Sequence, residues 1–143
     1  MTQPNNPADI SRGNRAQLAR VGYQYVVLRC VPRVDRQEFL NVGVIVYCHA
    51  HDFLRSAGRV DDDRLTALDP GLDLEAVATA LEAIRCVCAG EDAAGPAGQV
   101  SSSSRFGFLS AARSTVLQPG PIHGGMTRDP TRELVALMDG LVG

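Results

Sequence analysis

The sequence predicts an α+β domain in which helices pack on one face of a small antiparallel or mixed sheet. Segments 22–31 and 41–48 have the composition of strands, and segments 74–88 and 130–142 repeat apolar residues at helical spacing. The expected order of elements is β-β-β-α-α-β-α. Because the chain has 143 residues, we expect a single domain over 22–143.

Residues 1–21 are polar, with two prolines and three arginines, and predict a disordered N-terminal arm. The whole chain has 14 basic residues, all arginine, against 16 acidic ones, a formal net charge of −2. This near balance argues against nucleic-acid binding through bulk charge. No stretch approaches the roughly 18 apolar residues of a membrane span. The first twenty residues lack the apolar core of a secretory signal, so we expect a cytoplasmic protein.

The first predicted strand, 22–31, is rich in β-branched and aromatic residues and apolar on both faces, which is typical of a central strand. In the second, 41–48, Gly43 indicates a bulge or a close approach of another backbone. Residues 32–40 between them are too many for a tight hairpin and too few for a usual parallel crossover, so we expect an antiparallel pair. A weaker strand is predicted over 52–57.

Three aspartates at 61–63 predict the capped start of a short helix. The long helix that follows has its N-cap at Asp73 and its end at Gly90. Residues 91–104 consist largely of Gly, Ala and Pro with four consecutive serines. This composition predicts a flexible loop within the domain.

The last part of the chain carries one more strand and one more helix. Residues 106–109 form an apolar patch that we expect to dock on the core, and 114–118 are a short strand candidate. Residues 119–125 contain two prolines and three glycines and predict a loop. Asp129 caps the final helix, and Pro130 suits its first position, where a missing amide is harmless.

A polar stretch joins the end of the first predicted strand to the start of the second. Its polar side chains include Arg29, Arg33, Asp35, Arg36, Glu38 and Asn41. Guanidinium groups at such a place can hold a phosphate or carboxylate through two parallel hydrogen bonds. The alternative is that Arg33 with Asp35, and Arg36 with Glu38, neutralise each other on the surface.

A second polar stretch contains Arg113, Thr115, Gln118 and His123. If the 114–118 strand pairs beside the first two strands, Arg113 and His123 reach Arg29 and Arg33 and form a cationic pocket. Glu38 and His123 are then the candidate acid and base. The alternative is an edge strand with solvated polar ends.

We expect no cofactor and no metal site. The cysteines are expected to be thiols, as in a reducing compartment: Cys30, Cys48, Cys86 and Cys88. His49 and His51 would share one face of a strand, but two imidazoles need a third ligand such as His123. A phosphate-binding Gly-x-x-x-x-Gly-Lys loop is excluded because the chain has no lysine.

Three strings resemble the opening of a bacterial family catalogued as domain of unknown function 3037: Tyr23-Gln-Tyr-Val-Val-Leu-Arg29, Val31-Pro-Arg33 and Asn41-Val-Gly-Val-Ile45. The likeness covers about residues 22–140, and its polar positions are Arg29, Arg33, Glu38, Asn41, Arg113, Thr115, Gln118 and His123. The resemblance supplies no established activity. It implies a gene position beside HipA-like serine/threonine kinases, and hence a role as a partner or accessory protein.

Three functions follow as hypotheses. The first is a small binding or accessory protein, not an enzyme, that acts through a protein partner such as a HipA-like kinase. The second is an enzyme or ligand-binding domain for a phosphorylated or anionic small molecule, held by Arg29, Arg33 and Arg113. The third is a nucleic-acid accessory protein that uses the arginines of the arm, Arg12, Arg15 and Arg20; the net charge disfavours it.

Overall fold

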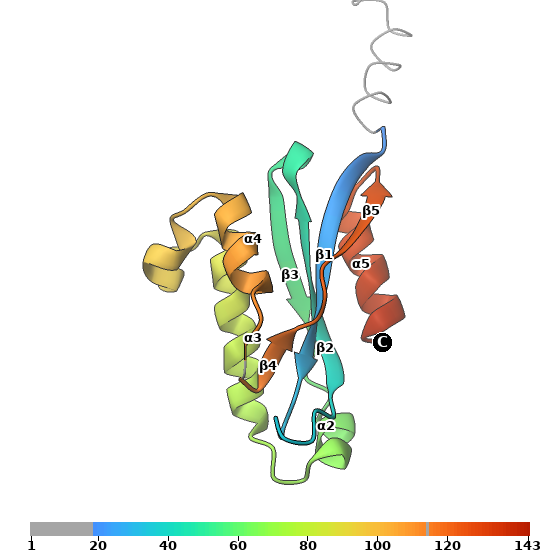
Figure 1. The fold of residues 1–143 in the computed structure, drawn as a ribbon, viewed down its shortest axis with the longest axis vertical. Helices are drawn as coiled ribbons and strands as arrows, with labels where there is room; N and C mark the ends of the chain where they lie inside the picture. The colour runs from blue at the N-terminus through green and yellow to red at the C-terminus, as the bar shows by residue number, and fades with distance from the viewer. Residues whose placement is uncertain (1–18, 114) are drawn as a thin grey trace, which may run out of the picture.

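The structure, a computed structural model, describes residues 19–113 and 115–143. Residues 1–18 of the predicted arm therefore lie outside the described residues. Its elements are β1 (Val21–Cys30), β2 (Leu40–Cys48), the 3-10 helix η1 (His49–His51), β3 (Phe53–Gly58), α2 (Asp62–Leu68), α3 (Leu74–Ala89), the 3-10 helix η2 (Asp92–Gly98), α4 (Ser102–Ser110), β4 (Leu117–Pro119), β5 (His123–Thr127) and α5 (Pro130–Leu141). This content confirms the α+β class (Figure 1).

The strands form one antiparallel sheet in the order β3-β2-β1-β4, with β5 also paired to β1. β5 pairs with the beginning of β1 and β4 with its end, so the two short strands share one edge of β1 (Figure 1). The predicted antiparallel pairing of the first two strands is confirmed.

The β1–β2 ladder contains the irregularity that Gly43 predicted. Leu28 lies opposite Gly43, but Arg29 lies opposite Asn41, which leaves Val42 as the extra residue of a bulge. A Cβ on Gly43 would lie 2.7 Å from the Ala57 carbonyl oxygen in β3. Both predicted explanations of this glycine, a bulge and a close backbone approach, are therefore confirmed.

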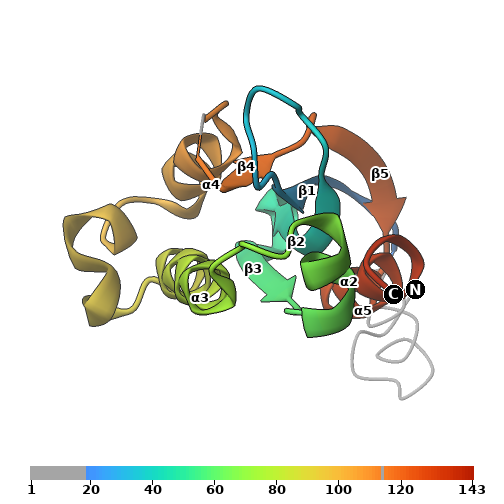
Figure 2. The ribbon, with the colours of Figure 1, turned by 90° about the horizontal axis from the view of Figure 1, so that it is seen from below.

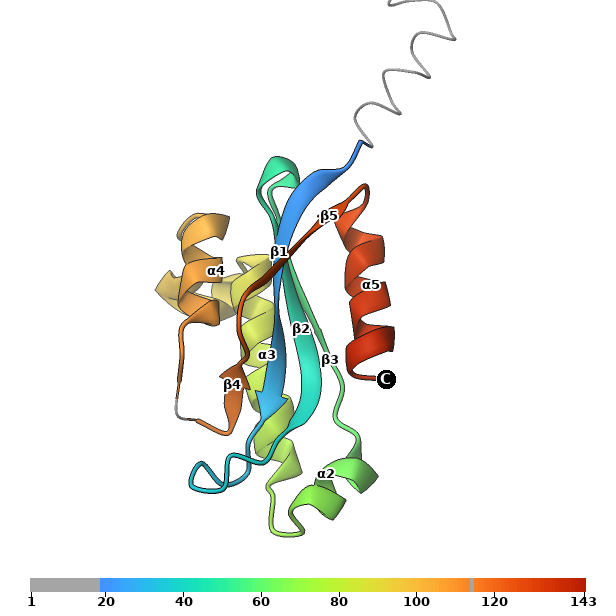
Figure 3. The same ribbon diagram turned by 45° about the vertical axis from the view of Figure 1, so that its right-hand side comes forward.

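The helices cover both faces of the sheet, and the prediction that they lie on one face is wrong. Figure 3 shows α3 and α4 on one side and α5 on the other. The α3 side buries Val26, Leu28 and Ile45, whereas the α5 side buries Val44 and Val46. The physical reason is already visible in β1 and β2, because strands that are apolar on both faces need cover on both faces.

Two predicted loops contain regular structure. Within 91–104 the chain forms η2, and α4 begins at Ser102 with the Ser101 hydroxyl accepting the Ser104 amide at 3.2 Å. Packing of the 106–109 patch, as expected, fixes this helix against the core. Within 119–125 the structure starts β5, whose Gly125 lies so close to the Tyr23 ring that a Cβ would approach it to 2.7 Å. That glycine serves tertiary packing rather than a turn.

The predicted helix caps are confirmed. The side chains of Asp61, Asp73 and Asp129 accept backbone amides of the first turns of α2, α3 and α5. Gly90 ends α3 with a φ of 68°, the left-handed conformation that favours glycine. Within 19–113 and 115–143, none of the helices is long and apolar enough to cross a membrane.

Candidate functional site

The connection between β1 and β2 holds its charged side chains in two neighbouring ion pairs. Arg33 donates to both carboxylate oxygens of Asp35, at 3.2 and 2.7 Å, and Arg36 does the same to Glu38, at 2.8 and 3.1 Å. The backbone turns beneath them, since the amides of Arg36 and Gln37 both donate to the Arg33 carbonyl. The side chains thus neutralise each other, as the second reading of this stretch expected.

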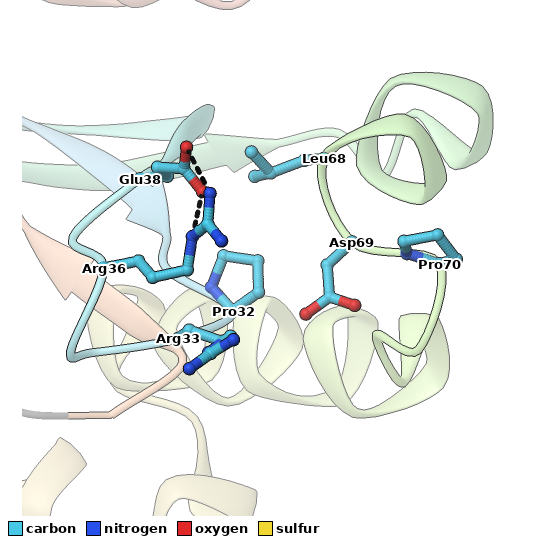
Figure 4. Close-up of a pocket in the computed structure, with 7 residues that line it drawn as sticks. All are labelled: Pro32, Arg33, Arg36, Glu38, Leu68, Asp69 and Pro70. Carbon is cyan, nitrogen blue, oxygen red and sulfur yellow. Dashed lines mark hydrogen bonds and ion pairs between the residues drawn. The ribbon is translucent and has the colours of Figure 1, made fainter.

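A pocket of about 220 Å³ lies between this loop and the turn that follows α2. Figure 4 shows Asp69 across the pocket from the loop, with the Asp69 carboxylate pointing toward the loop. Asp69 is held in place by the Gly71 amide, which donates to it at 2.9 Å. The lining carries Arg33 and Arg36 together with the carboxylates of Glu38 and Asp69, so its formal charge is zero. Such a lining offers an anion no net attraction.

The ion pairs shift both loop carboxyls in the same direction. The hydrogen bond from Arg36 lowers the pKa of Glu38 below its ordinary 4.5, and the one from Arg33 lowers the pKa of Asp35 below 3.8. A lowered carboxyl pKa favours the folded arrangement above the ordinary pKa, and this preference is lost as the pH falls through the lowered value. Both pairs are therefore intact near neutral pH and open only in acid.

Replacing Arg36 by glutamine is expected to return the pKa of Glu38 toward 4.5, because it removes the hydrogen bond that lowers that pKa. The matched change Arg132→Gln, on α5, is expected to leave it low. An NMR pH titration of the Glu38 side-chain carboxyl carbon measures both. A wild-type Glu38 that already titrates at 4.5 would contradict the ion pair.

Arg29 supports the aromatic side chain at the end of the loop. Its guanidinium carbon lies 4.3 Å from the centre of the Phe39 ring, a cation–π contact. The same guanidinium packs against Gly120, where a Cβ would lie 3.2 Å from it. Its Nε is buried and has no hydrogen-bond partner among the residues described. The half-buried Arg29 thus holds Phe39 in one position by packing.

Arg29, Asn41 and Gln118 lie on three neighbouring strands, because β4 pairs beside β1 as expected of the strand at 114–118. Arg29 lies opposite Asn41 in β2 and opposite Gln118 in β4. Both amides are engaged by backbone, however. Asn41 Nδ2 donates to the Leu141 carbonyl at 3.1 Å and Gln118 Nε2 to the Thr115 carbonyl at 3.0 Å, while the Thr115 hydroxyl donates to a carbonyl of its own turn. The Asn41 bond joins α5 to β2, whereas the Gln118 and Thr115 bonds stay within the turn that leads into β4.

The candidate acid and base, Glu38 and His123, lie in different places. His123 begins β5 opposite Tyr25, and the two rings stack with centroids 5.1 Å apart. Tyr25 precedes Arg29 by four residues, which is about 13 Å along a strand. Glu38 lies in the loop beyond the far end of β1, bound to Arg36. The structure therefore does not bring the two groups together.

Arg113 also lies apart from Arg33. Its guanidinium covers the Phe108 ring at 4.5 Å and donates to the Phe108 carbonyl. It lines an apolar groove of about 230 Å³ against α3, whereas Arg33 lines the loop pocket. The two polar stretches do meet through backbone, since the Val31 amide donates to the Val116 carbonyl at 2.7 Å. Their described side chains nevertheless do not form the shared cationic pocket that was predicted.

Metal ligands are not clustered: across 19–113 and 115–143 no three histidine, cysteine or acidic side chains are placed to hold an ion. His49 and His51 lie in η1 rather than in a strand, and the Tyr47 hydroxyl lies 2.9 Å from His49 Nδ1. All the cysteines are free and buried, which includes Cys86 and Cys88 of α3. Burial raises the pKa of Cys30 and of Cys88 to about 11.

Sequence reasoning missed two apolar side chains that the loop exposes. Val34 is 47% exposed and Phe39 is 45% exposed. The available signal was the apolar pair Phe39-Leu40 just before the second strand, of which only Leu40 packs against the core. Nothing in the local pattern connects this loop with Asp69, so the opposite wall of the pocket had no signal at all.

A family model described as "Protein of unknown function (DUF3037)" matches residues 25–142. No curated protein and no solved structure matches the chain. The match begins within β1 and covers every element after it, including the loop pocket.

Proposed function

The chain belongs to the DUF3037 family of proteins of unknown function, and we propose that it is an accessory protein that binds a protein partner. The proposed binding surface is the β1–β2 loop, 31–39, together with the turn at 68–70. One observation carries the proposal: this loop presents two exposed apolar side chains, Val34 and Phe39, next to arginines that already form ion pairs or pack on the ring.

The chemistry of the loop supports a protein partner. Interface centres are enriched in aromatic side chains and arginine, and most of the binding free energy comes from a few such residues. Phe39 is half exposed yet packed against Arg29, and the half-exposed Val34 lies in the chain between Arg33 and Asp35, the partners of the first ion pair. Side chains that are ordered before binding lose less conformational entropy on binding.

The first partner to test is a HipA-like serine/threonine kinase encoded beside the gene, in the bacterial cytoplasm. The family resemblance supports this choice.

A small anionic ligand receives less support from the same pocket. Arg33 and Arg36 are both bound to carboxylates, and Asp69 adds a further negative charge. A phosphate would have to displace Asp35 or Glu38 before it could bind two parallel donors. A nucleic-acid role rests on the arm, of which Arg12 and Arg15 lie outside the described residues.

Isothermal titration of the chain with the neighbouring kinase tests the proposal. We expect one-to-one binding with a dissociation constant in the micromolar range or below, and a dependence on salt that reflects the loop charges. An unrelated serine/threonine kinase of similar size is the control partner. Absence of heat and of co-elution with the neighbouring kinase at about 100 μM would reject it as the partner.

A further inference from the structure

β3 is an edge strand with an unused row of backbone groups. Among the described strands it pairs only with β2, and Figure 2 shows it at the side of the sheet away from β4 and β5, next to α3. Directly after β3, the Arg59 amide donates to the Val42 carbonyl. Because antiparallel pairs alternate, Leu54, Ser56 and Gly58 then point their amides and carbonyls away from β2. In the described chain, no backbone of another element bonds to these groups.

A groove follows this edge between β3 and α3. Its larger part, about 530 Å³, is lined by the consecutive residues 51–56, and its smaller part, about 260 Å³, by 56–58. Consecutive strand residues alternate between the two faces, so a groove that all of them line follows the edge itself. Ser56 and Arg85 line both parts, which makes the groove continuous. The opposite wall is one stripe of α3, with residues Ala78, Leu81, Glu82 and Arg85.

The larger part of the groove has guanidinium groups without carboxylate partners. Arg85 is not one of them, because Glu82 binds it at 2.8 Å and Glu91 binds it at 3.0 Å. Arg105 donates only to backbone carbonyls, and its Nε is buried with no partner among the residues described. For Arg55, no described carboxylate lies within 4 Å. Arg55 and Arg105 therefore leave positive charge available at this end.

The remaining groups define the polarity of the groove. Asp52, at the charged end, already accepts the Ser102 hydroxyl at 2.7 Å. The other end is formed by small and apolar residues, among them Ala57, Ala78 and Leu81. A ligand that fits both ends is extended, apolar along most of its length and acidic at one terminus.

We propose that this groove binds an extended segment of a partner protein, which adds a strand antiparallel to β3 and places acidic side chains against Arg55 and Arg105. Strand addition of this kind satisfies the open edge of β3 by main-chain hydrogen bonds, and side-chain pockets supply the selectivity. Because an antiparallel strand runs opposite to β3, the acidic residues lie at the C-terminal end of the bound segment. The groove is separate from the β1–β2 loop, so this inference goes beyond the proposed function.

The test uses the full chain and a probe labelled at its N-terminus, fluorescein-Thr-Val-Thr-Val-Thr-Val-Glu-Glu-amide, with binding followed by fluorescence anisotropy. We expect saturable binding, weakened at least about tenfold when the probe ends in Lys-Lys. Arg55→Glu is expected to weaken binding of the Glu-Glu probe to the same extent. Arg132→Glu is the matched control, an exposed arginine in the first turn of α5, where a carboxylate is tolerated.

Backbone-methylated probes test strand addition without altering the protein. Two versions of the probe carry N-methyl groups on alternate amides. Only one set faces β3, so one version is expected to bind at least about tenfold more weakly than the other. Equal binding of the two versions, equal binding to Arg55→Glu, or no binding of the Glu-Glu probe at about 1 mM would each overturn the proposal. Self-association of the chain through β3 that excludes the probe would overturn it as well.

Discussion

Replacing Phe39 by alanine is expected to weaken partner binding at least about thirtyfold, or about 2 kcal/mol, the loss typical of an interface hot spot. The Phe39 ring is 45% exposed and is held by Arg29 at 4.3 Å, so it is available to a partner and already ordered. Truncation removes that apolar surface and also uncovers the Arg29 guanidinium. Titration of the variant with the proposed HipA-like partner kinase measures the change in Kd.

Phe108→Ala is the matched control for this prediction. Phe108 is also exposed, at 54%, and also lies beneath an arginine, Arg113 at 4.5 Å, but it belongs to α4. The chemistry of the two substitutions is therefore the same, and only the surface differs. We expect Phe108→Ala to bind the kinase as the wild type does. Equal losses in both variants would mean that the β1–β2 loop is not the binding surface.

Truncation of β2 on either face of the sheet is expected to be strongly destabilising. Ile45 and Val44 are both 0% exposed, Ile45 packed in the core beneath α3 and Val44 in the core beneath α5. Ile45→Ala is expected to lower the free energy of unfolding by about 2–5 kcal/mol. Val44→Ala removes a smaller group and is expected to cost at least about 1.5 kcal/mol.

Urea unfolding followed by circular dichroism measures both losses, with Val135→Ala, a 58% exposed side chain of α5, as the control. The control is expected to change stability by less than about 0.5 kcal/mol. If Val44→Ala were as mild as the control, α5 would not cover the second face of the sheet, and the arrangement of helices on both faces would be wrong.

The parts of the fold that local chemistry determines could be predicted from the sequence. Asp73 caps α3, and Gly90 ends it, because a side-chain acceptor and a left-handed residue suit those positions wherever the helix lies. Gly43 predicted its bulge for the same kind of reason. The two apolar faces of β1 also indicate that helices must cover both faces of the sheet, as α3 and α5 do.

The parts that depend on contacts distant in the chain could not be predicted. Gly125 stands in a segment with the composition of a loop, but the structure places it in β5, where the absence of a side chain makes room for the Tyr23 ring. α4 begins within a run of serines, whose helix preference is weak. This helix presents Phe108, and the Arg113 guanidinium packs on the Phe108 ring instead of reaching Arg33. The two polar stretches thus meet through the backbone hydrogen bond from Val31 to Val116, whereas the side chains of Arg33 and Arg113 line different pockets.

Hydrogen exchange of the chain, alone and bound to the proposed HipA-like partner kinase, tests most directly whether the β1–β2 loop is the partner-binding surface. The account predicts slowed exchange of the backbone amides in 31–39 and in the turn around Asp69, with little change along α5. A complex in which these amides exchange as fast as in the free chain, while protection appears elsewhere on the molecule, would contradict it.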